Sequence, residues 1–243
     1  MDEPWLAVLS HDYAEHIGRY QQVSMALMAA GAVVVGHDHT GHGQAAGEPG
    51  LVTDIEDLVT AQHAVIERAS DDHSGLPVVL IGVGMGGTVA ARYAQRYPDR
   101  LAALVLAAPI LGVWPMLDLL ADNEIPEVSI DPAALSRDQA ACADYTEDPL
   151  VWHGPFRRAT LEAFDKCLRT IDFDHPLGDE LPGLWLHGDA DALVPEADAR
   201  TGMDRIRGLR FEEHHYPGAR HDLFHETNAA EVLADLLSFV RRT

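Results

Sequence analysis

Short apolar runs alternate with amphipathic stretches along most of the chain. Residues 5–9 and 32–35 are uninterrupted apolar runs, which predict buried β-strands. Between them, residues 20–30 carry apolar side chains at helical spacing and stop before Gly31, a residue typical of helix C-termini. The pattern therefore begins as strand, helix, strand. Further along the chain it predicts strands over residues 78–81, 101–107, 184–187 and 209–216, and helices over 54–68, 88–97, 196–207 and 228–242.

Residues 112–176 interrupt this alternation. They hold several prolines, scattered aromatic residues and both cysteines, Cys142 and Cys167. We interpret this segment as a helical cap inserted into a core that residues 1–111 and 177–243 form. Strands that alternate with helices predict an α/β fold, with a mostly parallel sheet of about six strands covered by helices on both faces.

Polar and glycine-rich segments follow several of the predicted strands. Residues 10–13, 37–43 and 82–86 come directly after three strands, and residues 188–191 and 220–222 lie in later loops. Parallel sheets place their sites at the carboxyl ends of the strands, so we expect these segments to form one site.

The segment from Val78 to Gly87 reads as a buried strand, a glycine-rich turn and the start of a helix. This is the context of a nucleophile elbow, the motif G-x-S-x-G. Gly82 and Gly86 occupy its two glycine positions, but Gly84 stands where the serine belongs. The segment predicts the turn without its usual nucleophile.

The composition limits the partners. The chain has 39 acidic and 17 basic residues, for a formal charge of −22. Such a surface repels the phosphates of nucleic acids and anionic lipids, so neither is an expected partner. No apolar run approaches the roughly 20 residues of a membrane span, and no secretory signal is visible. Two cysteines make no disulfide framework, so we expect a cytoplasmic protein. The sequence assigns no oligomeric state.

Five motifs together resemble the α/β-hydrolase fold and, within it, the monoacylglycerol lipase group. They occur in the order of that group and span nearly the whole chain. The resemblance implies an ester hydrolase for small apolar or acyl-chain substrates, with a cap over an acyl-chain pocket and no cofactor. The motifs are residues 15–20 (EHIGRY), 38–43 (DHTGHG), Gly82 with 85–87 (MGG), 186–191 (LHGDAD) and 218–221 (GARH).

The resemblance also implies roles for single residues. His221 matches the catalytic histidine, and Asp191 matches the acid that orients it. Gly84 stands at the nucleophile position. The backbone N–H groups of Tyr13 and Met85 match the oxyanion hole.

Some neighbouring residues compete for these roles. Asp189 lies close to Asp191, but the register of the family motif favours Asp191. We interpret Asp222 and His225, which follow His221, as solvated side chains.

Three histidines, His37, His39 and His42, offer a possible metal cluster. Their match to the DHxGHG loop of the family favours a structural hydrogen-bonding role instead. No carboxylate–histidine spacing supports a metal, so none is expected.

The chain departs from the family pattern at the reacting centre. Asp12 replaces the glycine that follows the first histidine of the family's HG loop, and Val83-Gly84 replaces His-Ser at the elbow. The pattern also lacks the two leading strands of the fold, which predicts a shortened sheet. The other motifs are intact, which favours deliberate replacement or repurposing of the site over drift.

These departures predict that ester hydrolysis is lost or very weak. Gly84 cannot form an acyl-enzyme, and removing the nucleophile of a comparable triad costs about 10⁶ in rate. A carboxylate on Asp12 about 5 Å from an oxyanion adds a repulsion of about 3 kcal/mol at an effective dielectric of about 20.

Two alternatives to a disabled ester hydrolase remain open. One is that Asp12, beside the apolar Val83, acts as a general base that abstracts a proton from carbon, as in a Kemp-type elimination. Desolvation next to an apolar side chain makes a carboxylate a stronger base. Otherwise the pocket is a non-catalytic binder of apolar ligands, and Asp12 caps a turn through its side chain.

Overall fold

A computed structural model describes residues 4–127 and 129–243, and its strands form one sheet in which every pairing is parallel. The six strands lie in the order β2-β1-β3-β4-β5-β6, which confirms the predicted α/β sheet. Because all strands run the same way, their carboxyl ends meet at one edge. The strands are β1 (Trp5–Ser10), β2 (Ala32–Gly36), β3 (Val78–Val83), β4 (Ala103–Ala107), β5 (Gly183–Gly188) and β6 (Phe211–Tyr216).

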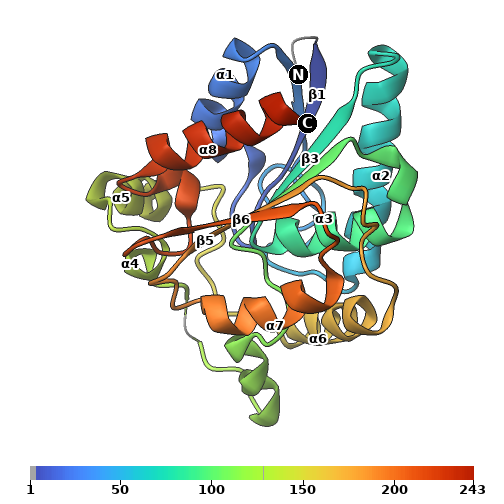
Figure 1. Ribbon diagram of the computed structural model, residues 1–243. Coiled ribbons are helices and arrows are strands. Elements are labelled where there is room, and N and C mark those ends of the chain that lie inside the picture. Colours follow the sequence, from blue (N-terminus) through green and yellow to red (C-terminus); the bar gives the residue numbers. More distant parts are fainter. Residues whose placement is uncertain (1–3, 128) are drawn as a thin grey trace.

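Helices cover both faces of the sheet (Figure 1). One face carries α1 (Gln21–Ala29) and α8 (Ala229–Arg242). The other face carries four helices, and shorter helical segments lie in the loops. The four are α2 (Ile55–Asp72), α3 (Met85–Arg96), α6 (Arg158–Phe173) and α7 (Glu196–Ile206); the shorter ones are η1 (Ile17–Tyr20), η2 (Pro98–Arg100), η3 (Pro115–Ala121), α4 (Pro132–Leu135), α5 (Gln139–Glu147) and η4 (Leu223–His225).

The side chains of β1 alternate between two buried clusters. Leu6 and Val8 pack in the cluster that includes α2 and α3, whereas Trp5, Ala7 and Leu9 pack in the cluster that includes α1 and α8. A strand that is buried on both faces has no polar positions, which is why it appears in the sequence as an uninterrupted apolar run.

Several elements differ in their bounds from the sequence-based expectation, and for β2 and α3 the difference has a clear physical reason. Residues 33–35 of β2 are only partly buried, because β2 lies at the edge of the sheet and pairs with β1 alone. Helix α3 begins at Met85, three residues before the predicted start at residue 88. Glycines 86 and 87 have low helix propensity, so the pattern hid the first turn of this helix.

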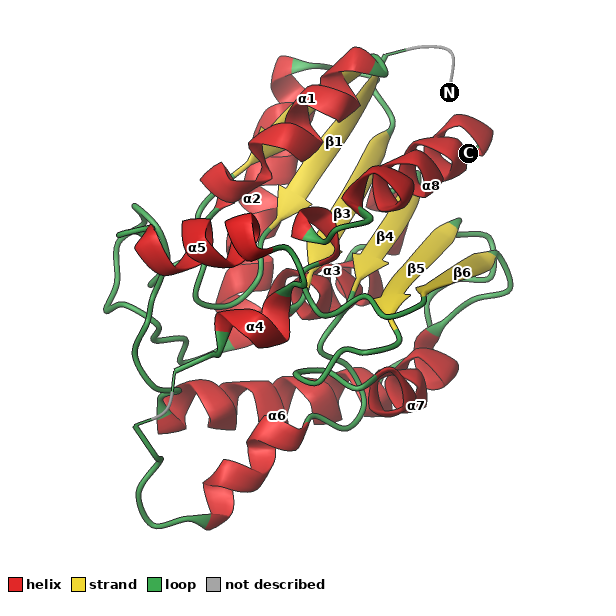
Figure 2. Cartoon of the chain, turned by 90° about the vertical axis from the view of Figure 1, so that its left-hand side faces the viewer, coloured by secondary structure: helices red, strands yellow, loops and turns green. Residues whose placement is uncertain are grey.

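Residues 112–176 contain η3, α4, α5 and α6. Figure 2 shows α4 and α5 beyond the arrowheads of the strands, over the carboxyl edge of the sheet. Helix α6 instead packs against α2, α3 and α7, and its Leu161 and Phe164 belong to the buried cluster on that face. The division into core and cap at these boundaries stays a prediction.

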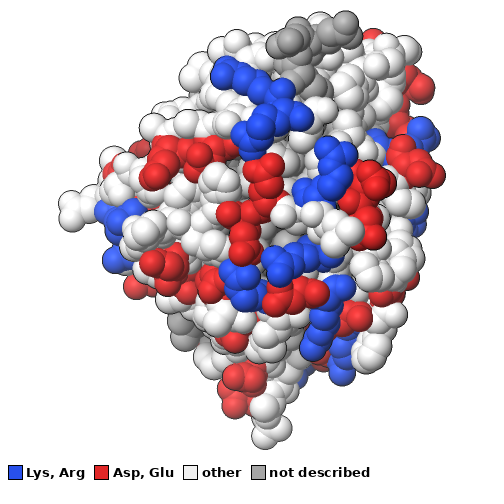
Figure 3. Space-filling view, viewed as in Figure 1, with Lys and Arg blue, Asp and Glu red and all other residues white. Residues whose placement is uncertain are grey.

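Acidic and basic side chains are interspersed on the surface. On the face in Figure 3, arginine and lysine groups lie beside aspartates and glutamates instead of forming one continuous basic area. Across the described ranges, no helix combines the length and apolar character that crossing a bilayer requires.

Candidate active site

The elbow has the geometry of a tight strand-to-helix turn at Gly84. This residue has φ 50° and ψ −113°, a backbone conformation that residues with a side chain adopt only under strain. Gly84 caps the N-terminus of α3, so the N–H of Met85 begins the helix without a partner inside it. The turn therefore presents a donor that the helix itself leaves unpaired, at the positive end of the helix dipole.

Gly82 and Gly86 let three segments approach closely at this turn. A Cβ on Gly82 would lie 2.3 Å from the carbonyl oxygen of Gly86. A Cβ on Gly86 would lie 2.1 Å from the carbonyl oxygen of Ser10, at the end of β1. The two glycines thus bring the loop after β1 against the start of α3, which places Asp12 beside Gly84.

The loops after β5 and β6 bring His221 and Asp191 together. Asp191 Oδ2 lies 2.7 Å from His221 Nδ1, and Asp191 Oδ1 accepts hydrogen bonds from the N–H groups of Leu193 and Val194, both at 2.9 Å. The loop amides fix the carboxylate, and the carboxylate fixes the imidazole ring. Asp189, the competing acid, is exposed and accepts a hydrogen bond from the Gly218 N–H.

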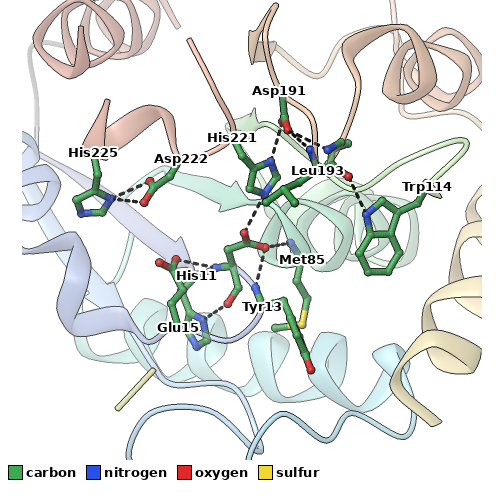
Figure 4. Close-up of polar contacts among 12 residues, drawn as sticks. His11, Tyr13, Glu15, Met85, Trp114, Asp191, Leu193, His221, Asp222 and His225 are labelled. Carbon is green, nitrogen blue, oxygen red and sulfur yellow. Dashed lines mark hydrogen bonds and ion pairs between the residues drawn. The ribbon is translucent and has the colours of Figure 1, made fainter. Parts of the chain in front are cut away.

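The carboxylate of Asp12 lies between the donors assigned to the oxyanion hole and His221. Its Oδ1 accepts hydrogen bonds from the N–H groups of Tyr13 at 2.7 Å and Met85 at 2.6 Å, the two donors assigned to the oxyanion hole. Its Oδ2 lies 3.0 Å from Nε2 of His221. Figure 4 shows Tyr13, Met85 and His221 converging on this point from three segments of the chain.

The same carboxylate occupies the space of a side chain at position 84. A Cβ on Gly84 would lie 1.8 Å from Asp12 Oδ1 and 2.1 Å from Asp12 Cγ. The sequence predicted a carboxylate at some distance from a developing oxyanion. The structure places the carboxylate inside the hole itself, because two backbone N–H groups and His221 attract it there.

His221 lies between two carboxylates. Burial lowers the pKa of its imidazole, but the charge of Asp191, the charge of Asp12 and the hydrogen bonds to both raise the pKa well above its usual value. Burial also disfavours the charged form of Asp191, yet His221 and His187 together hold the pKa of this carboxyl well below its usual range. The resting site is therefore a protonated imidazole held between two carboxylates.

Two buried residues hold the loop that carries Asp12. His11 Nδ1 donates to the backbone carbonyl of Asp12 at 2.7 Å, and its Nε2 accepts from the N–H of His39 at 2.9 Å. Burial lowers the pKa of His11 to about 3, so this ring is neutral and can play both roles. Glu15 Oε1 accepts the Asp12 N–H at 3.1 Å.

A buried ion network lies behind this loop and corrects one interpretation. Asp222 is 6 % exposed and pairs with His225 at 2.8 Å and with Arg19 at 3.3 Å, so neither it nor His225 is a solvated side chain. Arg19 also pairs with Glu15 at 2.9 Å. Burial opposes the charge on His225, but Asp222 raises the pKa of this histidine to about 9.

Apolar side chains surround the opening above Asp12. A space of about 20 Å³ is bounded by Asp12 and His221 on one side and by side chains such as Tyr13, Trp114 and Phe156 on the other. A larger cavity of about 300 Å³ lies next to it. The two share the walls Met116, Ile130, Phe156 and Leu193.

His37 and His39 pack on each other, whereas His42 packs on His11. The ring centroids of His37 and His39 are 5.0 Å apart, and His39 Nε2 lies 2.9 Å from the Ser10 hydroxyl. Within residues 4–127 and 129–243, no group of three or more His, Cys, Asp or Glu side chains is arranged to hold a metal ion.

Comparison with known proteins places this geometry in a family. Over residues 3–228 the sequence matches the model of the serine aminopeptidase family, S33. The chain belongs to this family. It is 33 % identical over 249 residues to a monoacylglycerol lipase of Mycolicibacterium smegmatis, covering 98 % of this chain and 89 % of the relative. It is 30 % identical to the human monoglyceride lipase, covering 91 % of this chain and 76 % of the relative.

Solved structures of similar proteins share the fold. The crystal structure of a Paleococcus ferrophilus monoacylglycerol lipase matches with a TM-score of 0.80 at 25 % identity, covering 100 % of this chain and 97 % of the other. A soluble variant of the Saccharomyces cerevisiae monoglyceride lipase, in complex with a substrate analog, has a TM-score of 0.80 at 19 % identity, covering 100 % and 88 %. The chain is thus an α/β-hydrolase with a monoacylglycerol lipase-like scaffold.

The structure brings together every site residue that the sequence proposed. Gly84, Asp12, Asp191 and His221 meet at the carboxyl edge, and the elbow residues Gly82, Val83 and Gly86 and the donors Tyr13 and Met85 surround them. Sequence reasoning gave no role to Glu15 and Arg19. Their (i, i+4) spacing was the available sign of an ion pair.

Proposed function

We propose that this monoacylglycerol lipase-like scaffold no longer hydrolyses esters through a residue at position 84, and that it takes a small apolar or acyl-chain compound above Asp12 and His221. The observation that carries the proposal is the position of the Asp12 carboxylate, which fills both the oxyanion hole and the space of the missing side chain. An ester carbonyl has no free donors there, and His221 is already protonated.

The apolar walls support the substrate class. The larger cavity of about 300 Å³ lies within the size range of small-molecule pockets. Cys142 and Cys167 are free thiols, which fits the reducing environment of the cytoplasm, the location that we propose.

We expect hydrolysis of p-nitrophenyl butyrate by the wild-type chain to be insensitive to His221→Ala, with rates equal within about threefold. The reason is that a triad without a nucleophile makes no use of its base. The measurement is steady-state release of p-nitrophenol by both chains, with circular dichroism to verify that each is folded. A drop of tenfold or more in the variant would show that a His221-dependent esterase is present and contradict the proposal.

A second candidate function is general base catalysis by Asp12. It is favoured by the 13 % exposure of the Asp12 side chain and its place beneath apolar walls. We expect turnover of nitrobenzisoxazole, an activated C–H substrate, to fall by about 10²–10⁴ in Asp12→Asn. Asp189→Asn, an exposed carboxylate, is the control. Equal rates in wild type and Asp12→Asn would eliminate this function. Saturable ligand binding without turnover would instead support a non-catalytic binder of apolar ligands.

A further inference from the structure

We propose that the pocket above Asp12 binds a primary ammonium group on a hydrocarbon tail, with the ammonium against Asp12 Oδ2 and the tail in the larger cavity. The proposal rests on the proposed function and deepens it, because it names the head group that the apolar compound carries. The pocket supports it through its hydrogen-bonding groups, its charge, its aromatic walls and its size.

The Asp12 carboxylate keeps one acceptor position for a ligand. An ionised carboxylate accepts about four hydrogen bonds. Oδ1 accepts two of them, from the N–H groups of Tyr13 and Met85, and Oδ2 accepts one from Nε2 of His221. Asp12 also lines the small space of about 20 Å³. A donor that enters this space therefore has a position left on Oδ2.

The side-chain donors around the small space are already paired within the protein. Among the described residues that line it, the Tyr13 hydroxyl donates to a backbone carbonyl at 2.9 Å, and Trp114 Nε1 donates to another at 3.2 Å. Both ring nitrogens of His221 are bonded to carboxylates. A ligand head that only accepts hydrogen bonds, such as a carboxylate, finds no side-chain donor there. A head that only donates, such as an ammonium group, finds Oδ2.

The charges at the pocket also favour a cation. The imidazolium of His221 lies 2.7 Å from the carboxylate of Asp191 and 3.0 Å from that of Asp12, so the three groups together carry one negative charge. An ammonium group brings this sum to zero, whereas a carboxylate doubles the excess. Within the described chain, no lysine or arginine side chain lines either space. The formal charge of −22 on the whole chain favours the approach of cations over anions.

Aromatic walls and a limited volume define the head group. Tyr13 and Phe156 stack with their ring centroids 4.9 Å apart, and Trp114 meets Phe156 edge-on at 5.6 Å. All three side chains line the small space, and aromatic groups recur around ammonium ligands because their π faces attract cations. A volume of about 20 Å³ holds one group of the size of a water molecule. It admits a primary ammonium group and excludes trimethylammonium.

The larger cavity defines the tail. It has a volume of about 300 Å³ and shares Met116, Ile130, Phe156 and Leu193 with the small space. A ligand with its head at Asp12 therefore extends its hydrocarbon chain between these apolar walls, where burial of the chain stabilises the complex. An unbranched octyl chain suits a cavity of this size, so octylammonium is the probe.

The test compares four ligands with one tail: octylammonium, octyltrimethylammonium, octanol and octanoate. Calorimetric titration of the wild-type chain at about 0.15 M salt, which screens surface charge, measures each affinity. We expect octylammonium to bind one to one and at least about tenfold more tightly than octanoate and octyltrimethylammonium, with octanol between. Octyltrimethylammonium carries the same charge and tail, so equal affinity for it would place the cation on the acidic surface and overturn the proposal. Octanoate that binds as tightly as octylammonium overturns it as well.

Asp12→Asn is the matched variant, because it keeps the size of the side chain and removes its charge. We expect its affinity for octylammonium to fall at least about tenfold and its affinity for octanol to stay within about threefold, since an amide oxygen still accepts a hydroxyl group. Asp189→Asn, at an exposed carboxylate, leaves both affinities unchanged. Equal affinity for octylammonium in wild type and a folded Asp12→Asn overturns the proposal. The ligand series on the wild-type chain decides the question even where the variant folds poorly.

The outcomes separate this proposal from the proposed function. Saturable binding of octanol or octanoate without a preference for octylammonium overturns the ammonium head group alone. Absence of binding by all four ligands overturns both the head group and the apolar ligand of the proposed function. His221-dependent ester hydrolysis overturns the proposed function, whatever the order of the four affinities.

Discussion

The double variant Gly84→Ser/Asp12→Gly is expected to hydrolyse p-nitrophenyl butyrate at least about 10⁴-fold faster than the wild type, since removing the nucleophile of a comparable triad costs about 10⁶. Serine returns the attacking oxygen, and glycine empties the oxyanion hole of Tyr13 and Met85. Loss of the Asp12 charge also removes one of the two carboxylates that raise the pKa of His221. The measurement is steady-state kinetics of the purified chains.

The single variants are the matched controls. Gly84→Ser alone is expected to stay well below the rate of the double variant, because a Cβ 1.8 Å from Asp12 Oδ1 forces the carboxylate to shift but leaves its charge in the site. Asp12→Gly alone lacks a nucleophile. Adding His221→Ala to the double variant should abolish the gain. A folded double variant with the wild-type rate would contradict the inference that this scaffold retains a lipase-like site.

The double variant Gly84→Ser/Asp12→Gly is expected to be less stable to unfolding than the wild type. A serine at φ 50° and ψ −113° has a strained backbone, which typically costs of order 1–3 kcal/mol. Glycine relieves this strain, so the native chain combines an unstrained elbow with a carboxylate from a neighbouring loop. The change at position 84 and the change at position 12 are therefore coupled in space, although 72 residues separate them in the sequence.

The fold was predictable because strands buried on both faces leave a simple mark in the sequence. Leu6 and Val8 face one cluster and Ala7 faces the other, and an uninterrupted apolar run of strand length is typical of such burial. The edge strand β2 shows the limit of this reasoning, since an apolar run does not reveal how much of the strand a neighbour covers. Propensity likewise missed the glycine-rich first turn of α3.

Motifs predicted which residues lie together at this edge of the sheet, but they did not predict the direction of the Asp12 side chain. Its position depends on the N–H of Met85, which is 73 residues away, and on His221, which is 209 residues away. The Arg19–Asp222 pair spans 203 residues. Such contacts arise only when the parallel strands bring their loops to one edge, so no local pattern records them.

Replacement of Asp191 by asparagine is expected to lower the free energy of unfolding by about 3 kcal/mol. This is the low end for removing one partner of a buried ion pair, because His221 keeps Asp12 as its other carboxylate. His221 and the Asp191 side chain are almost fully buried, and they are joined at 2.7 Å. Asp189→Asn is the control, with an expected change within about 0.5 kcal/mol, because Asp189 is exposed and asparagine still accepts the Gly218 N–H. Urea unfolding at several pH values provides the measurement.

The effect of Asp191→Asn should depend on pH in a defined direction. The folded pKa of His221 is raised, so its contribution is complete below about pH 6.5 and is lost as the pH rises through the folded value. The folded pKa of Asp191 is lowered, so its contribution is complete above about pH 4 and is lost on acidification. The difference in unfolding free energy between wild type and variant should therefore be largest between these limits and shrink at alkaline pH.

His225, with its pKa raised to about 9, adds a slope of the same sign to both chains, so it cancels in the difference. A difference that grows above pH 9 would mean that His221 is not held as an imidazolium, and the proton that blocks ester hydrolysis in the proposed function would be absent.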